Sequence, residues 1–173
     1  MKRDTFLVAL GLFVVGYGTN VSTPFLVLYR DRLDLSANAT QLIFVVYVVG
    51  ILSTLMLAGQ LSDRYGRRRL LIASLALSAL GSAVLIAGRD SFVLLMMGRV
   101  ILGVVSGLGL GVGAAWLQEL MGPAQQHKAA LVATLVTYGG FGAAPPLSVL
   151  YEWLGPSPLI VPFVFHIVLT LGI

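Results

Sequence analysis

The densest group of ionisable side chains in this sequence lies between residues 59 and 69, in the stretch Gly-Gln-Leu-Ser-Asp-Arg-Tyr-Gly-Arg-Arg-Arg. Asp63 and Arg67 are four residues apart, the spacing at which opposite charges pair if a helix continues through them. Gly59 lets a neighbouring helix approach closely, and Gly66 supplies the backbone freedom of a tight turn. The stretch can therefore make a reversible electrostatic contact, and its arginines can bind anionic lipid headgroups.

A second ionised side chain, Arg99, lies deep within a long apolar run, roughly 10 Å from its edge if the run is helical. An arginine at that depth usually faces protein or a water-filled cavity, because insertion into hydrocarbon costs about 2.5–3.5 kcal/mol. Two interpretations stay open. Arg99 either lines a cavity, where it binds an anionic substrate or tunes a nearby carboxylate, or it bonds helix-end carbonyls.

Covalent chemistry has few candidates. The chain has no cysteine, its two histidines are far apart, and no nucleophile–base pair is recognisable. We expect no enzyme activity, no metal site and no cofactor. No Asp or Glu lies well inside an apolar run, so a proton carrier within this chain would be Asp31, Asp34 or His166. A lone histidine such as His166 is also typical of a packing or hydrogen-bonding residue.

The composition is that of a membrane protein. Hydrophobic residues make up 58% of the 173 positions and charged residues 10%, with a mean hydropathy of +0.95. A soluble domain carries about 25% charged residues, so most of this surface must face lipid. The net charge of +4 does not indicate nucleic acid as a partner, because the basic residues lie between apolar runs and not on a soluble face.

The apolar runs predict transmembrane helices, since no alternating strands of the barrel type appear. Asn38 and Gln41 predict a capping box at the start of the second helix. The predicted spans are residues 5–29, 41–61, 70–87, 92–117, 129–151 and 159–173. The fold class expected is therefore all-α, a polytopic membrane helical bundle.

The sixth run is short of a complete span. Its residues 159–173 reach roughly 22 Å as a helix, less than the hydrocarbon thickness of about 30 Å. We expect the chain to be a fragment or a truncated product.

Basic residues predict the orientation, because loops rich in Lys and Arg stay in the cytoplasm. One side would carry Lys2, Arg3, Arg64, Arg67, Arg68, Arg69 and Lys128, and the other Arg30, Arg32 and Arg89. The N-terminus is therefore expected inside.

An ordinary positive-inside loop explains the three arginines at 67–69 but not the other residue types of the stretch. The stretch resembles the signature G-x-L-x-D-R-x-G-R-R-x, which lies between the second and third helices of the major facilitator superfamily. Further along, Arg99 and Gly103 are similar to the R-x-x-x-G pattern of the fourth helix in that family. The resemblance extends over the whole chain, which would be the N-terminal six-helix half, with the C-terminal half missing.

The resemblance implies that the stretch acts as a conformational gate at the cytoplasmic surface. Asp63 would face the N-terminus of a helix in the missing half, where the helix dipole favours negative charge. Arg67 would pair with Asp63 and with Glu119 at the end of the fourth helix. The gate residues implied are Gly59, Asp63, Arg64, Gly66, Arg67, Arg68 and Glu119.

Several polar side chains share helix faces that this family uses to line its cavity. Besides Arg99, the candidates are Tyr17, Asn20, Tyr47 and Tyr138. For each of them, interhelical hydrogen bonding or an interfacial position is an equally good interpretation.

The function expected is secondary active transport of a small organic solute by alternating access, coupled to protons, with efflux favoured over uptake. The partners would be the lipid bilayer of the plasma (inner) membrane, a small-molecule solute, protons and the missing C-terminal half. A second hypothesis is a membrane-embedded interaction or assembly protein that has a transporter-like fold and no transport activity.

Overall fold

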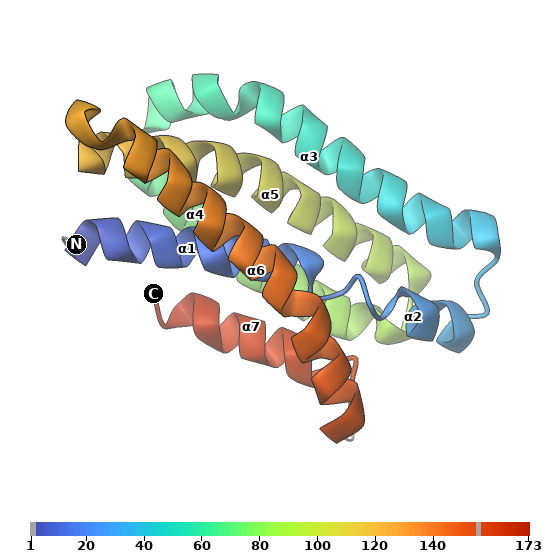
Figure 1. Cartoon of the computed structure of the whole chain (residues 1–173). Coiled ribbons are helices and arrows are strands. Elements are labelled where there is room, and N and C mark those ends of the chain that lie inside the picture. Colours follow the sequence, from blue (N-terminus) through green and yellow to red (C-terminus); the bar gives the residue numbers. More distant parts are fainter. Residues whose placement is uncertain (1–2, 155–156) are drawn as a thin grey trace.

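The computed structural model describes residues 3–154 and 157–173, and within these ranges it contains helices and turns but no strand. The predicted all-α fold is confirmed. The elements are α1 (Arg3–Asn20), α2 (Leu26–Arg32), α3 (Ala37–Tyr65), α4 (Arg67–Ala87), η1 (Gly88–Asp90), α5 (Phe92–Met121), η2 (Pro123–Gln125), α6 (Gln126–Leu154) and α7 (Val161–Leu171). The long helices run side by side as a bundle, with the two chain termini at the same end (Figure 1). We call this end the N-terminal end, and the end formed by α2, η1 and the α6–α7 connection the far end.

Helix α5 is the centre of the bundle and packs against α1, α3, α4 and α6. Its glycines explain how close the neighbours come. A Cβ atom at Gly103 would overlap the carbonyl oxygen of Tyr47, and one at Gly107 would overlap the hydroxyl of Thr54, both on α3. Small residues on one side of α5 therefore let the backbones of α3 and α5 approach each other closely.

The first apolar run is not one continuous helix. Helix α1 ends at Asn20, turns occupy residues 21–25, and the short α2 follows. Pro24 disfavours helical backbone at Thr23, and the Thr23 hydroxyl donates a hydrogen bond to Oδ1 of Asn20 at 3.4 Å. The prediction of a single helix over residues 5–29 is therefore wrong at this turn.

The start of α3 also differs from the prediction. Ser36, not Asn38, is the N-cap residue, and its hydroxyl accepts a hydrogen bond from the backbone N–H of Ala39 at 3.2 Å. Serine is among the best N-cap residues, so a cap two residues earlier lengthens the helix by one half-turn. The predicted capping box at Asn38 and Gln41 is wrong.

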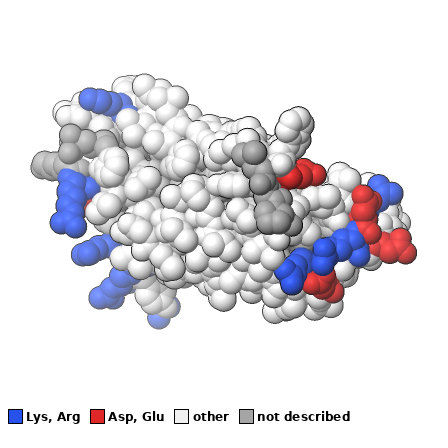
Figure 2. All heavy atoms as spheres, turned by 90° about the horizontal axis from the view of Figure 1, so that it is seen from below, with Lys and Arg blue, Asp and Glu red and all other residues white. Residues whose placement is uncertain are grey.

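Four of the helices in the described ranges, α3, α4, α5 and α6, are long and apolar enough to cross a membrane. Helix α7, with 11 residues, is shorter than a span. Charged side chains gather at the two ends of the molecule, and a wide belt without charge separates them (Figure 2). The chain is an integral membrane protein.

Candidate functional site: a charged turn and a buried polar interior

The charged stretch forms the connection between α3 and α4 at the N-terminal end. Gly66 has a φ of 83°, a left-handed conformation that favours glycine, and it ends α3 directly before α4 begins. Arg67 is therefore the first residue of α4. Its guanidinium group makes an ion pair with the Glu119 carboxylate near the end of α5, with Nη2 and Oε1 3.0 Å apart. The predicted pairing of Arg67 with Glu119 is confirmed, and it ties the α3–α4 turn to α5.

Asp63 does not pair with Arg67. The helix stops at Gly66, so the two side chains do not share the helical face that their spacing requires, and no basic group of the described residues lies within 4.0 Å of the Asp63 carboxylate. This part of the prediction is wrong. Asp63 and Arg67 instead border the same cavity of about 190 Å³ between α3 and α5. The exposed Asp63 carboxylate is left available for a partner beyond these residues.

The other residues of the stretch lie at the surface of this chain. Arg64 stacks on the ring of Tyr65, with its Cζ atom 5.4 Å from the ring centroid, and Arg68 is exposed. A Cβ atom at Gly59 would meet no atom within 4 Å. Gly59 therefore has no close helix neighbour within the described ranges, and it lines the same cavity as Asp63 and Arg67. The predicted close approach of a helix to Gly59 stays a prediction for a helix outside these ranges.

Arg99 lies inside the bundle near the far end, with 1% of its side chain exposed. Its guanidinium group lies over the ring of Tyr47 on α3, with the Cζ atom 5.9 Å from the ring centroid. Within residues 3–154 and 157–173, its Nε and Nη2 atoms have no hydrogen-bond partner, and neither does the hydroxyl of the buried Tyr29 on α2. A buried cation without a carboxylate is costly, so this cluster is the most unusual feature of the interior.

The remaining cavity candidates occupy different environments. Tyr17 is buried against α7, where its ring contacts Phe165 edge-on with centroids 6.0 Å apart. Asn20 and Tyr47 are partly buried, and Tyr138 on α6 is 67% exposed. Among these candidates Tyr138 is the most exposed, and Arg99 and Tyr17 are closed off. A solute could touch Arg99 or Tyr17 only after the helices around them separate.

Sequence reasoning missed a polar cluster between α4 and α7. The His166 ring is fully buried; its Nδ1 atom is 2.7 Å from the Ser82 hydroxyl and its Nε2 atom 3.2 Å from that of Ser78. The two serines are four residues apart on one helical face, which was the available signal. His166 therefore has the hydrogen-bonding role expected of a lone histidine, and it links α7 to the bundle.

The residues described contain no group of three or more His, Cys, Asp or Glu side chains that could hold a metal ion. The buried polar residues of these ranges include Arg99 and His166 but no carboxylate. Asp31 and Asp34 are exposed at the far end. Lys2, which contributes to the predicted orientation, lies outside the described residues.

The sequence model of the Major Facilitator Superfamily matches residues 8–173. The chain belongs to this family. The match covers α1 through α7, and so includes both the charged turn and the Arg99 cluster. The resemblance drawn from the charged stretch is confirmed.

Curated relatives of this superfamily member have transporter names. The human facilitated glucose transporter member 12 of solute carrier family 2 is 33% identical over 122 residues, which are 70% of this chain and 19% of that protein. The human proton myo-inositol cotransporter is 30% identical over 132 residues, 76% of this chain and 20% of that protein. The bacillibactin exporter of Bacillus subtilis is 30% identical over 97 residues, 54% of this chain and 24% of that protein. The chain spans about one fifth to one quarter of the length of these relatives.

Proposed function

We propose that this chain is the N-terminal part of a secondary transporter that moves a small organic solute across a membrane by alternating access. Membership of the superfamily and the transporter names of the relatives support the proposal. The observation that carries it is the ion pair of Arg67 with Glu119 at the turn between α3 and α4. This ion pair joins the start of α4 to the end of α5 and so holds the turn next to Asp63. The exposed Asp63 carboxylate can then make a contact with a partner helix in one conformation and lose it in another.

The gate would work through Asp63. In the state closed at this end, its carboxylate accepts a partner from the C-terminal half, and the ion pair of Arg67 and Glu119 holds the turn in place for that contact. Opening separates Asp63 from its partner while Arg67 and Glu119, both in this half, stay together. A surface ion pair contributes about 0.2–1 kcal/mol. The contact of Asp63 with its partner therefore favours the closed state without locking the protein in it.

We further propose that transport is coupled to protons and that export is the physiological direction. The proton-cotransporter name of one relative and the exporter name of another support these finer proposals. No buried carboxylate is present among the described residues. The proton-carrying group would then lie in the C-terminal half, or be His166 after α7 moves.

The proposed localisation is the plasma (inner) membrane, with the N-terminal end in the cytoplasm. Among the described residues, the N-terminal end carries Arg3, Arg64, Arg67, Arg68, Arg69 and Lys128, whereas the far end carries Arg30, Arg32 and Arg89. The excess at the N-terminal end supports this orientation.

The test is flux of a panel of sugars, polyols and siderophore-type solutes in proteoliposomes that contain the complete protein, with and without a pH gradient. We expect a solute that crosses faster than in protein-free liposomes, and faster still when a pH gradient drives protons in the opposite direction. D63N should slow this flux several-fold without changing the amount inserted, and R69Q is the matched control at the same turn. Absence of flux for the whole panel, or equal flux in D63N and the wild type, would contradict the proposal.

A further inference from the structure

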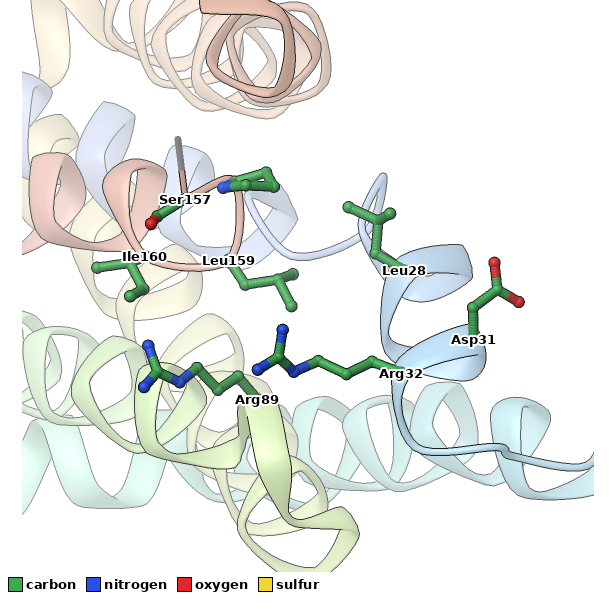
Figure 3. A pocket seen from close by; sticks show the side chains of 8 residues that line it. Leu28, Asp31, Arg32, Arg89, Ser157, Leu159 and Ile160 are labelled. Atoms are coloured by element: carbon green, nitrogen blue, oxygen red, sulfur yellow. The ribbon is translucent and has the colours of Figure 1, made fainter. Parts of the chain in front are cut away.

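A pocket of about 410 Å³ opens at the far end of the bundle, at the opposite end from the charged turn. It lies between α2, η1 and the chain at residues 157–160, and its size is that of a small-ligand site (Figure 3). The lining residues are Leu28, Asp31, Arg32, Arg89, Ser157, Pro158, Leu159 and Ile160. None of them belongs to the gate or to the cavity candidates.

Two arginines are fixed beside each other in this pocket by one carboxylate. Arg32 on α2 donates from Nε to Oδ1 of Asp90 at 2.8 Å, and its Nη2 atom is 2.7 Å from the same oxygen. Arg89 donates from Nε to Oδ2 of Asp90 at 3.0 Å. Both oxygens of Asp90 are thus engaged, and the two guanidinium groups are held in place before any ligand arrives.

The charges of this trio do not cancel. Two guanidinium groups and one carboxylate leave one positive charge, and each guanidinium group has five N–H donors, of which Asp90 engages only some. The Arg32 and Arg89 guanidinium groups also lower the pKa of Asp90, chiefly through their hydrogen bonds, so this carboxyl group stays ionised. Asp31 lies at the rim, and its carboxylate points away from both arginines (Figure 3).

The wall above the arginines is apolar. Leu159 and Ile160 lie over the arginine side chains, and Leu28 closes the side formed by α2 (Figure 3). Donors on one side and hydrocarbon on the other suit a ligand that has an anionic head and an apolar tail. We propose that this pocket is a binding site for an amphipathic anion, whose phosphate or carboxylate group bonds to Arg32 and Arg89 while its apolar part contacts Leu28, Leu159 and Ile160.

This proposal is independent of transport, so it can be tested by binding alone. Decyl phosphate would be titrated into the purified protein in a neutral detergent, with decanol and inorganic phosphate as the two half-ligands. R89Q and R32Q should each weaken decyl phosphate binding about tenfold, the value of one charge-assisted contact. R30Q removes the same charge from the same end but from outside the pocket, and it should leave binding within about twofold. Thermal melting of each variant shows that it is folded.

The site is overturned if R30Q weakens binding as much as R89Q, since the effect is then general electrostatics. The proposal is also overturned if decanol or inorganic phosphate binds as tightly as decyl phosphate, since either the arginines or the apolar wall then contribute nothing to binding. Phosphatidylcholine nanodiscs containing some phosphatidylglycerol distinguish the source of the ligand by native mass spectrometry. Retention of phosphatidylglycerol by the wild type but not by R89Q assigns the pocket to a lipid headgroup. Equal retention, with decyl phosphate binding still lost in R89Q, assigns it to a soluble amphipathic anion.

Discussion

At the level of single residues, Arg99 is a buried cation that has no carboxylate partner among the described residues. The residue is 1% exposed, and its guanidinium group lies over the ring of Tyr47. A cation–π contact contributes about 2 kcal/mol when desolvated, whereas burying a charge costs several kcal/mol. We therefore expect Arg99 to lower the stability of this bundle, as a residue retained for a functional task would.

We predict that Arg99→Met leaves the fold as stable as the wild type or stabilises it by about 1–3 kcal/mol, because a similar volume is filled without a buried charge. The midpoint of thermal unfolding in detergent measures this. Leu102→Ala, a cavity-forming change one turn away, is the control and should destabilise by about 2–5 kcal/mol. If the methionine variant loses as much stability as the alanine variant, Arg99 has a structural partner and the functional interpretation fails.

The Asp90 carboxylate gives a prediction about pH. Hydrogen bonds from Arg32 and Arg89 lower its pKa in the folded state, so its contribution is complete above the ordinary pKa of Asp and is lost as the pH falls through the lowered value. D90N should therefore melt at a lower temperature than the wild type at about pH 7, and the two melting temperatures should converge as the pH falls below the ordinary pKa of Asp. If the melting temperatures of D90N and the wild type differ by the same amount at every pH, the ion pairs of Asp90 are not the cause of the difference.

At the level of elements, the surroundings of two glycines show which helix faces are packed against a neighbouring helix. Gly103 on α5 is in contact with the backbone of α3, whereas Gly59 on α3 faces open space within this chain. Gly103→Ala should destabilise the isolated bundle by about 1–3 kcal/mol, because the two backbones must separate. Gly59→Ala should instead stabilise it by up to about 1 kcal/mol through helix propensity. The free energies of unfolding of the two variants, measured in parallel, test this difference. Equal destabilisation by both substitutions would mean that Gly59, like Gly103, is packed against a neighbour.

The helices could be predicted from the sequence because each apolar run is long and ends in charged or turn-forming residues. The turn at residues 21–25 was missed because Val21 and Phe25 continue the apolar pattern, although Asn20, Ser22, Thr23 and Pro24 together form a cluster of turn-forming residues. The ion pair of Arg67 with Glu119 followed from the family resemblance. The expected pair of Asp63 with Arg67 failed because helical spacing was assumed across Gly66, whose left-handed conformation ends the helix.

The buried contacts between distant elements were beyond sequence reasoning. His166 lies 84 residues from Ser82, and although the spacing of Ser78 and Ser82 marks a polar helix face, it does not say which residue contacts that face. The same holds for Arg32 and Asp90, which are 58 residues apart in the sequence. Both contacts depend on which helices are neighbours in the bundle. The polar cluster around His166 and the far-end pocket could therefore be found only in the structure.

At the level of the whole molecule, the division into two charged ends and an uncharged belt limits the chain to two orientations in a bilayer (Figure 2). The N-terminal end carries the α3–α4 turn with its arginines at 67–69, and the far end carries the more balanced set around Asp90. Moving a charged end through hydrocarbon is prohibitive, so the orientation fixed at insertion persists and decides which compartment each site meets.

The absence of cysteine from the sequence makes this orientation directly measurable. Asn38→Cys would place a thiol at the exposed start of α3 at the far end, and Gln125→Cys would place one in η2 at the N-terminal end. Because basic loops remain cytoplasmic, a membrane-impermeant maleimide should label N38C in intact cells, and Q125C only after permeabilisation. The reverse pattern would put Asp63 and Glu119 outside the cell, where they could not close a cytoplasmic gate, and it would expose the Arg32–Asp90–Arg89 pocket to the inner leaflet instead of the outer one. One labelling experiment therefore decides the compartment of both ends of the molecule.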